Sequence, residues 1–347
     1  MASLVKFGND LYTGARSFNF VGKRRIWYLI AAVFLLISIV VPILRGGFVF
    51  GIEFRGGSEF QVAGVAAEPD EQLAIDTVNQ VVPDASPHVT LVGDASNRSV
   101  RVQTEQLGSD VSNEVRAALA EAYGVPLEDV TASFVGPSWG QDITTAAIRA
   151  LIVFVVLSAI FMWIYFRTWK MALAANASLL HTMIITTGVY GIFGFEITPS
   201  AVIGFLTILG YALYDTVVVF DKVRENTAED GTESRRTFAE SVNLGVNQTL
   251  VRSINTGVIA ALPVAAILFV GAYLLGAGTL LDLALALFVG ILVGTYSTIF
   301  IAAPLYAQLR EREPAIVAAD KRTLALREGA PASKKDAAPT SKKKARA

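Results

Sequence analysis

The chain has 347 residues, of which 53% are hydrophobic and 17% are charged, and its formal net charge is −1. This composition is too apolar for an ordinary soluble protein and indicates a membrane protein. A net charge near zero gives no basis for general binding to nucleic acid. The sequence contains no Cys and 2 His. Disulfides, thiolate zinc sites and cysteine nucleophiles are therefore excluded, and a histidine-rich metal site is not expected.

Long apolar runs predict the membrane-spanning helices. A helix needs about 20 apolar residues to cross about 30 Å of hydrocarbon, and buried helices of a soluble protein would not repeat that length so often in one chain. The predicted spans are residues 27–44, 150–166, 171–195, 197–220, 256–275 and 280–305. Because Arg45-Gly46-Gly47 offers no small-residue cleavage pattern, we expect the first span to be an uncleaved anchor rather than a secretory signal.

The distribution of Lys and Arg predicts the orientation of these spans. Basic residues gather in the N-terminal arm 1–26, the link 167–170, the loop 221–251 and the tail 310–347. The two short links around Glu196 and Ala277 contain no Lys or Arg. The positive-inside rule therefore predicts that both termini are cytoplasmic. The tail is rich in Ala, Lys, Pro and Ser, so we expect it to be disordered and its basic end to meet anionic lipid or ribosomal RNA.

Residues 46–142 then lie outside the cytoplasm, between the first span at 27–45 and the remaining bundle at 143–309. Their hydrophobic pattern alternates between strand-like and helical periods. The predicted strands are 58–64, 88–92, 99–104 and 130–135, and the predicted helices are 68–82 and 110–123. This β-α-β-β-α-β order is typical of a ferredoxin-like arrangement. The predicted fold is an α-helical membrane bundle of six spans with an α+β ferredoxin-like extracytoplasmic domain.

Asp215 is an acidic residue within the fourth predicted span. An ionised Asp at the centre of a membrane helix costs about 2.5 to 3.5 kcal/mol, so such residues usually face a bundle interior, a water-filled path or a partner charge. At about 1.5 Å per residue from Asp221, it lies roughly 9 Å inside the cytoplasmic boundary. One hypothesis is that Asp215 takes up and releases a proton. The alternative is a helix-end residue whose charge reaches the interface.

Arg252 is the candidate cation for Asp215, because it opens the fifth predicted span at a comparable depth. It shares a helical face with Asn255 and Thr256, and the three predict a polar path near Asp215. Further candidates for this path are Tyr211, Thr216 and His181. A lone membrane histidine is at least as often a packing residue. The small residues of the fourth and sixth spans are interpreted as sites of close helix packing.

No enzymatic motif accompanies these residues. The sequence has no Walker A pattern, no zinc-binding H-E-x-x-H and no convincing Ser/His/Asp grouping. The chain is therefore not expected to hydrolyse ATP or to hold a metal or cofactor. Any work that it does would draw on another subunit or on an ion gradient, worth about 2.3 kcal/mol per charge per 100 mV.

Two motifs carry a resemblance to a known family. Residues 51–57 read G-I-E-F-R-G-G, and the motif positions are Gly51, Glu53, Phe54, Gly56 and Gly57. Residues 210–226 contain the string D-T-V-V-V-F-D-K-V-R-E-N, and residues 247–252 read N-Q-T-L-V-R. Together they resemble the SecD/SecF family of protein-export membrane proteins, within the RND superfamily. The short outer domain and the D-T-V-V-V-F-D string resemble the SecF branch, and the similarity covers roughly residues 20–312.

The resemblance implies half of an RND-type transporter of the cytoplasmic (inner) membrane, which pairs with SecD beside the SecYEG channel. YajC and YidC are further partners that it implies. Such a subunit uses the proton gradient to promote export of preproteins after the SecA-driven step, with no cofactor, and sodium coupling is not excluded. Asp215 matches the family's proton-carrying aspartate, and Arg252 matches the arginine placed with it. Many relatives have an acid after the histidine of the third span, whereas Thr182 follows His181 here.

Two other functions remain open at this point. One is a small-molecule or lipid exporter of the wider RND class, which would need a partner half and a substrate pocket. The other is a non-transporting assembly scaffold, in which Asp215 and Arg252 hold helices together. Fold analogy alone does not separate these functions, and the motifs favour protein export.

Overall fold

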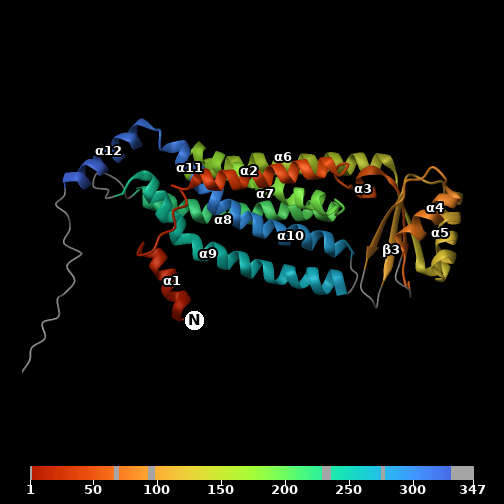
Figure 1. Ribbon diagram of the computed structural model, residues 1–347. Helices are drawn as coiled ribbons and strands as arrows, with labels where there is room; N and C mark the ends of the chain where they lie inside the picture. Colours follow the sequence, from red (N-terminus) through yellow and green to blue (C-terminus); the bar gives the residue numbers. More distant parts are fainter. Residues whose placement is uncertain (1, 66–69, 93–97, 229–235, 275–277, 330–347) are drawn as a thin grey trace, which may run out of the picture.

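The computed structural model describes residues 2–65, 70–92, 98–228, 236–274 and 278–329. These residues form an elongated helical bundle (Figure 1). Helices α1 (Ala2–Tyr12) and α12 (Pro314–Gly329) lie at one end, called here the terminal end. A small α+β domain lies at the other, called the domain end.

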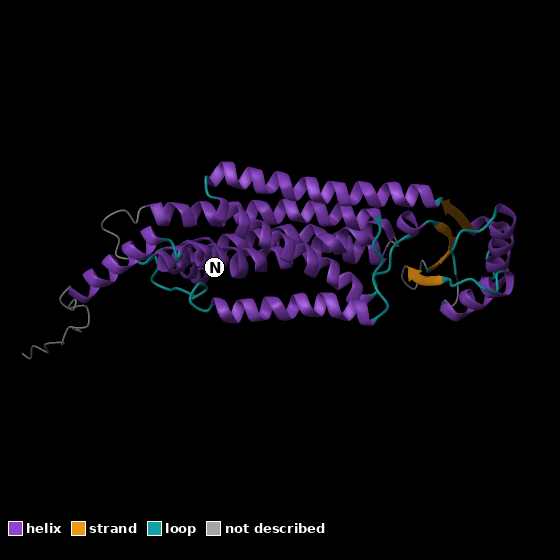
Figure 2. Ribbon diagram, turned by 90° about the horizontal axis from the view of Figure 1, so that it is seen from above, coloured by secondary structure: helices purple, strands orange, loops and turns teal. Residues whose placement is uncertain are grey.

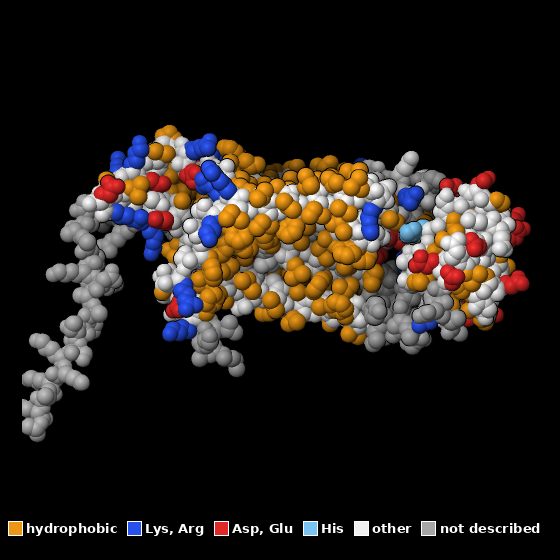
Figure 3. Space-filling model, in the orientation of Figure 1, with side chains coloured by type: hydrophobic (Ala, Val, Ile, Leu, Met, Phe, Trp, Pro, Cys, Tyr) orange, Lys and Arg blue, Asp and Glu red, His pale blue; other side chains and the backbone are white. Residues whose placement is uncertain are grey.

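Among the described helices, six are long and apolar enough to cross a membrane. They are α2 (Arg24–Leu44), α6 (Pro137–Phe166), α7 (Trp169–Phe193), α8 (Pro199–Ala228), α9 (Phe238–Ala266) and α10 (Gly278–Ser297). The last two continue as the π-helical segments η2 (Ile267–Leu274) and η3 (Thr298–Ala302), and α11 (Ala303–Arg310) follows η3. The six predicted spans are thereby confirmed. In Figure 3 a band of hydrophobic side chains covers the bundle between two charged ends, as a membrane-embedded surface requires.

Helices α7, α8 and α10 form the centre of the bundle. Their apolar windows are 44 to 56% buried within the chain, against 11 to 17% for α2, α6 and α9. Small residues allow the central helices to approach closely. A Cβ atom on Gly204 of α8 would lie 2.6 Å from that of Ala286 on α10, and one on Gly290 would collide with Ile208. The predicted packing role of these glycines agrees with these contacts.

The domain at the far end has the predicted β-α-β-β-α-β order. Its described strands are β1 (Gly57–Val62), β2 (His88–Val92), β3 (Ser99–Thr104) and β4 (Val130–Val135), with helices α4 (Glu71–Val81) and α5 (Ser109–Tyr123) between them and η1 (Leu127–Asp129) before β4. They form an antiparallel sheet in the order β2-β3-β1-β4, which is the ferredoxin-like topology. Phe60, Val102 and Leu119 are fully buried in its core. Figures 1 and 2 show the sheet between the bundle and the two helices.

Two predicted boundaries were wrong because hydropathy detects only the part of a helix that meets hydrocarbon. Helix α9 begins at Phe238 rather than at 256, so much of the predicted loop 221–251 is helical. Thr237 and Glu240 form a capping box at this start, and Val242 and Val246 are buried. Likewise α6 begins at Pro137, with Pro in its first turn, which moves the end of the outer domain from 142 to about 136.

The predicted disorder of the tail was also wrong for its first half, residues 314–329, which form α12. Composition predicts no core for this segment, but specific polar contacts dock it on α9. Asp320 accepts a hydrogen bond from the backbone N–H of Phe238 at 2.8 Å, and Arg327 forms an ion pair with Glu240 at 2.6 Å. Residues 330–347 lie outside the described part of the chain.

Candidate functional site

Asp215 is buried inside the bundle, with 4% of its surface exposed. Its Oδ1 atom accepts a hydrogen bond from Ser253 Oγ of α9 at 2.8 Å. Its Oδ2 atom is also buried and has no hydrogen-bond partner among the described residues. An ionised carboxylate that is buried without a paired cation costs several kcal/mol. A proton on Asp215 removes that cost, so this arrangement suits the neutral acid.

A layer of hydroxyl groups and one imidazole surrounds Asp215. Thr216 Oγ1 lies 3.0 Å from Thr298 Oγ1 of η3 and donates to the carbonyl oxygen of Ala212 at 2.8 Å. His181 Nδ1 of α7 lies 2.9 Å from Ser297 Oγ, the residue before Thr298. All of these side chains are buried. The layer therefore joins α7, α8, α9 and η3 at one depth of the membrane.

The backbone geometry explains why such short side chains meet. A Cβ atom on Gly294 of α10 would lie 3.2 Å from that of Ala212 on α8, and one on Gly257 of α9 would lie 2.8 Å from Thr295 Oγ1. These close approaches bring hydroxyl side chains within reach of Asp215. The π-helical turn also begins at Thr298, and π-bulges occur often at functional sites.

Arg252 does not pair with Asp215 in this conformation. No ion pair within 4 Å joins the two among the described salt bridges, and Arg252 is exposed while the next residue, Ser253, is fully buried. Its side chain lines a cavity of about 450 Å³, together with Tyr12, Tyr165, Val217, Val218, Asp221, Lys222, Glu225, Gln248 and Thr249. The cavity reaches to within one helical turn of Asp215 on α8 and of Ser253 on α9.

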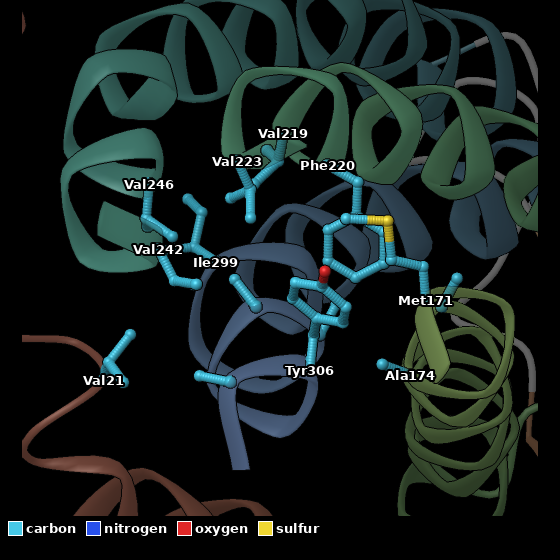
Figure 4. Close-up of a cluster of buried hydrophobic side chains, with 14 of the residues drawn as sticks. Val21, Met171, Ala174, Val219, Phe220, Val223, Val242, Val246, Ile299 and Tyr306 are labelled. Atoms are coloured by element: carbon cyan, nitrogen blue, oxygen red, sulfur yellow. The ribbon is translucent and has the colours of Figure 1, made fainter. Parts of the chain in front are cut away.

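An apolar cluster separates Asp215 from the terminal end within the bundle. It includes Val219 and Phe220 of α8, Val246 of α9, Ile299 of η3 and Tyr306 of α11, whose side chains converge in Figure 4. Val219 and Phe220 are fully buried and begin one turn beyond Asp215. The centre of the bundle is thus closed at this level, and the cavity with Arg252 lies beside it.

The other predicted path residues divide into two groups. Thr216 and His181 belong to the buried polar layer. Asn255 is exposed, Thr256 is half-buried, and neither is hydrogen-bonded to the carboxyl group of Asp215 in the described structure. Tyr211 is half-buried, and its hydroxyl group has no hydrogen-bond partner among the described residues.

Sequence reasoning missed Ser253, the direct partner of Asp215, and interpreted Ser297 and Thr298 only as packing residues. The helical spacing of residues in α9 could have indicated that Ser253 faces the bundle interior. The buried positions of α9 include Val246, Leu250, Ser253 and Gly257, which share one face at spacings of three and four residues. Arg252 falls outside this stripe, because neighbouring residues on a helix point about 100° apart.

The glycine-rich motif at 51–57 lies at the domain end, far from Asp215. Its centre forms the short helix α3 (Ile52–Arg55), and Gly56 and Gly57 have φ angles of +77° and +143° that other residues rarely adopt. The N–H of Gly51 donates to the carbonyl oxygen of Ile197 at 3.0 Å. Phe54 packs against the apolar cluster of Tyr190 and Phe205. The motif therefore joins the outer domain to the link between α7 and α8.

Comparisons with known proteins agree with this arrangement. Residues 114–312 match the profile of the family "Protein export membrane protein SecD/SecF, C-terminal". The chain is 43% identical over 327 residues to protein translocase subunit SecF of Streptomyces coelicolor, covering 94% of this chain and 86% of that protein. It is 41% identical over 339 residues to SecF of Mycobacterium tuberculosis, covering 95% of this chain and 76% of the relative.

A solved structure has the same fold. The crystal structure of SecDF from Thermus thermophilus, a translocon-associated membrane protein, matches with a TM-score of 0.72 at 29% identity. The match covers 86% of this chain and 39% of SecDF. The family profile covers more than half of the chain, and the SecF relatives are matched over most of their length. The chain therefore belongs to the SecD/SecF family of protein export membrane proteins.

Proposed function

We propose that this chain couples proton movement across the cytoplasmic membrane to preprotein export, with Asp215 as the residue that carries the proton. The single observation that carries this proposal is the buried carboxyl group of Asp215, whose Oδ2 atom has no partner in the described structure. Intramembrane ionisable groups are costly and are generally retained for a function. Among the described residues no ion pair joins Asp215 to a cation, so a change of its charge state requires a change in its surroundings.

Two states of the site follow from this geometry. In the first state, which the described geometry suits, Asp215 is neutral and accepts a hydrogen bond from the hydroxyl group of Ser253. In the second state Asp215 has lost its proton, and the guanidinium of Arg252 turns from its cavity toward the carboxylate. Arg252 is suited to this movement because its long side chain lies in a cavity one turn away rather than in a fixed ion pair.

The cavity with Arg252 is the proposed exit for the proton. The apolar cluster around Val219 and Tyr306 blocks the axis of the bundle, whereas the cavity is lined by polar and charged groups such as Asp221, Lys222 and Glu225. Water in such a cavity would receive the proton from Asp215. On this proposal the terminal end is cytoplasmic, as the positive-inside rule predicts, and the α+β domain lies outside the cytoplasm.

Partners follow from the relatives. This chain covers 39% of SecDF of Thermus thermophilus. In the proposed complex, a separate SecD subunit supplies the part of SecDF that this chain lacks. We place that pair beside the SecYEG channel, where it acts on the preprotein after the SecA-driven step, with YajC and YidC as accessory partners. No cofactor is assigned, since the ion gradient supplies the energy.

The test is proton flux into liposomes that hold this chain together with its SecD partner. The variant Asp215→Asn keeps the shape of the side chain and removes the titratable group. The control is Asp110→Asn, which changes an exposed acid of α5 in the α+β domain. We expect gradient-driven proton flux in the wild type and in the control, and none in Asp215→Asn.

Two outcomes separate the competing functions. If Asp215→Asn conducts protons like the wild type, Asp215 does not carry the proton. If Asp215→Asn no longer copurifies with SecD, the carboxyl group holds the assembly together and the scaffold function is favoured. A parallel measurement with a sodium gradient identifies the coupling ion, because a carboxylate can serve either cation.

A further inference from the structure

A cluster of charged groups lies where the α+β domain meets the bundle, at the end opposite the terminal apolar cluster. Its carboxyl groups come from four different elements, and they are Glu53 of α3, Glu59 of β1, Glu196 in the link between α7 and α8, and Asp282 of α10. Its cation is Arg101 of β3, which lies 3.5 Å from Glu196 Oε2 and 4.0 Å from Glu59 Oε2. The side chains of Arg101 and Glu196 are 17% and 9% exposed.

Two oxygens of this cluster have no partner. Glu53 Oε2 and Glu196 Oε1 are both buried and unpaired in the described structure. Both lie against the same point, because a Cβ atom on Gly51 would collide with Glu53 Oε2 and would lie 3.3 Å from Glu196 Oε1. The carboxyl groups of Glu53 and Glu196 therefore both lie close to Gly51.

The remaining members of the cluster already have partners. Asp282 Oδ2 accepts a hydrogen bond from Thr198 Oγ1 at 2.9 Å, and Glu59 Oε2 accepts one from Gln103 Nε2 at 2.9 Å. Arg45, the residue that follows α2, is exposed and donates a hydrogen bond to the carbonyl oxygen of Ile192. The other charged groups on the elements packed here, Arg55 and Asp142, are exposed as well.

The balance of charge in this junction is unfavourable if every acid is ionised. The four carboxylates would face one guanidinium among the described residues, in a region that excludes most water. Two like charges that share a buried site cannot both be ionised without a large penalty. A proton on Glu53 removes one of these negative charges.

We propose that Glu53 binds a proton at this junction, and that this proton holds the α+β domain against the membrane bundle. When the proton is lost, the carboxylates of Glu53 and Glu196 both lie beside Gly51. Their repulsion acts between α3, which leads directly into β1 of the domain, and the link that joins α7 to α8. The junction is then loosened, and the domain is free to change its orientation. This proton-binding site is separate from Asp215 and does not depend on its role.

The pH dependence has a definite sign. Burial raises the pKa of Glu53 above its usual value, and the charge of Glu196 adds to this effect, while a backbone hydrogen bond and Arg101 oppose it. A carboxyl group with a raised pKa stabilises the structure fully below its ordinary pKa and loses this contribution as the pH rises through the raised value. The junction is therefore closed at acidic pH and loosens as the pH on the domain side increases.

The experiment measures the distance between domain and bundle in the full chain, embedded in lipid nanodiscs. The sequence contains no Cys, so spin labels attach only to introduced cysteines. Suitable exposed positions are Asn113 on α5 and Phe193 at the end of α7. Distance distributions are recorded by electron paramagnetic resonance from about pH 4, near the ordinary pKa of Glu, to about pH 9.

Glu53→Gln is the diagnostic variant, because the amide has nearly the shape of the protonated acid and stays uncharged at every pH. In the wild type we expect one narrow distribution at acidic pH that broadens as the pH rises. In Glu53→Gln the narrow distribution should persist across the whole range. The control Glu105→Gln, which changes an exposed acid of the same domain, should behave like the wild type.

Infrared spectroscopy gives a second measurement that does not depend on domain motion. In an Asp215→Asn background, the carbonyl stretching band of protonated carboxylic acids should persist to higher pH in the parent chain than after Glu53→Gln. A wild-type distance that does not change with pH, or a band whose pH dependence Glu53→Gln leaves unchanged, would overturn the proton on Glu53. A Glu53→Gln distance that titrates like the wild type would overturn it equally.

Discussion

At the scale of single residues, the central feature is the carboxyl group of Asp215, of which one oxygen is hydrogen-bonded and the other is not in the described structure. Ser253 satisfies Oδ1 of Asp215, and Oδ2 remains without a partner in the described structure. A group in this condition responds strongly to a proton, because each ionisation state needs different neighbours. Burial favours the neutral acid, whereas the hydroxyl group of Ser253 donates a hydrogen bond to it. The candidate cation, Arg252, lines the adjacent cavity.

Ser253→Ala tests the hydroxyl contact itself. The substitution removes the hydrogen bond to Asp215 and leaves a buried acid with no partner on either oxygen, which costs about 1 to 3 kcal/mol. We expect a lower unfolding temperature for the purified chain and a shift in the pH dependence of proton flux. The matched control is Thr256→Ala on the same helix, a half-buried residue without a contact to Asp215. Equal effects of the two variants on flux would contradict a specific role for Ser253.

The sequence predicted that Asp215 and Thr216 lie within a membrane-spanning helix, because a polar residue within a long apolar run is easily recognised. It did not predict that Arg252 would be unpaired with Asp215, or that Ser253 would take its place. The difference arises from the rotation of α9, which turns Ser253 inward and Arg252 outward. A hydropathy profile gives the depth of a residue but not the direction in which its side chain points.

At the scale of elements, close contacts between α8 and α10 hold the polar layer together. A Cβ atom on Gly290 of α10 would collide with Ile208 of α8, whereas one on Gly210 of α8 would meet no atom within 4 Å. These two glycines look alike in the sequence, and only their neighbours distinguish them. Close helix packing was predictable from the small residues, but the particular pairs that touch were not.

Gly290→Ala tests this helix contact. The added methyl group forces α8 and α10 apart at Ile208, and overpacking of this kind costs about 1 to 3 kcal/mol. We expect a lower unfolding temperature in detergent micelles and a weaker response of preprotein export to the proton gradient. Gly210→Ala provides the control and should be neutral or slightly stabilising, because Ala is the better helix former. Similar losses in both variants would show that the cost does not come from the α8–α10 contact.

The boundaries of the strands and helices show which element ends the hydrophobic pattern of the sequence can predict. In the α+β domain the predicted strands 88–92, 99–104 and 130–135 coincide with β2, β3 and β4, since each has a strand-like hydrophobic pattern in the sequence. Helices α6 and α9 extend well beyond their apolar cores. Their outer turns are held by tertiary contacts and caps, and tertiary contacts are invisible in a hydropathy window.

At the scale of the whole molecule, the chain is a bundle with a proposed proton-binding group toward each end. The buried layer around Asp215 lies nearer the terminal end, and Glu53 and Glu196 lie beside Gly51 at the domain end. The central helix α8 runs between them, from Pro199 beside the junction to Asp215, a distance of about 24 Å at about 1.5 Å per residue. A rigid element of this kind can transmit a movement from one end to the other.

The overall plan of six spans and one outer domain was predictable from the sequence, because apolar length and basic residues dictate membrane topology. The junction was not. Arg101 and Glu196 are far apart in the chain, and no local pattern indicates that they meet at 3.5 Å. The family motif marked the right segment, but its physical role, a tight turn that leaves room for two carboxyl groups, became visible only in three dimensions.

The most direct test of proton-driven export follows a stalled preprotein as it moves through membrane vesicles that contain the complete complex. Translocation is compared between the wild type, Asp215→Asn and the control Asp110→Asn while an imposed proton gradient is switched on and off. If Asp215 carries the proton, the gradient accelerates export in the wild type and in Asp110→Asn and has no effect in Asp215→Asn. Equal acceleration in all three proteins would contradict proton coupling through Asp215.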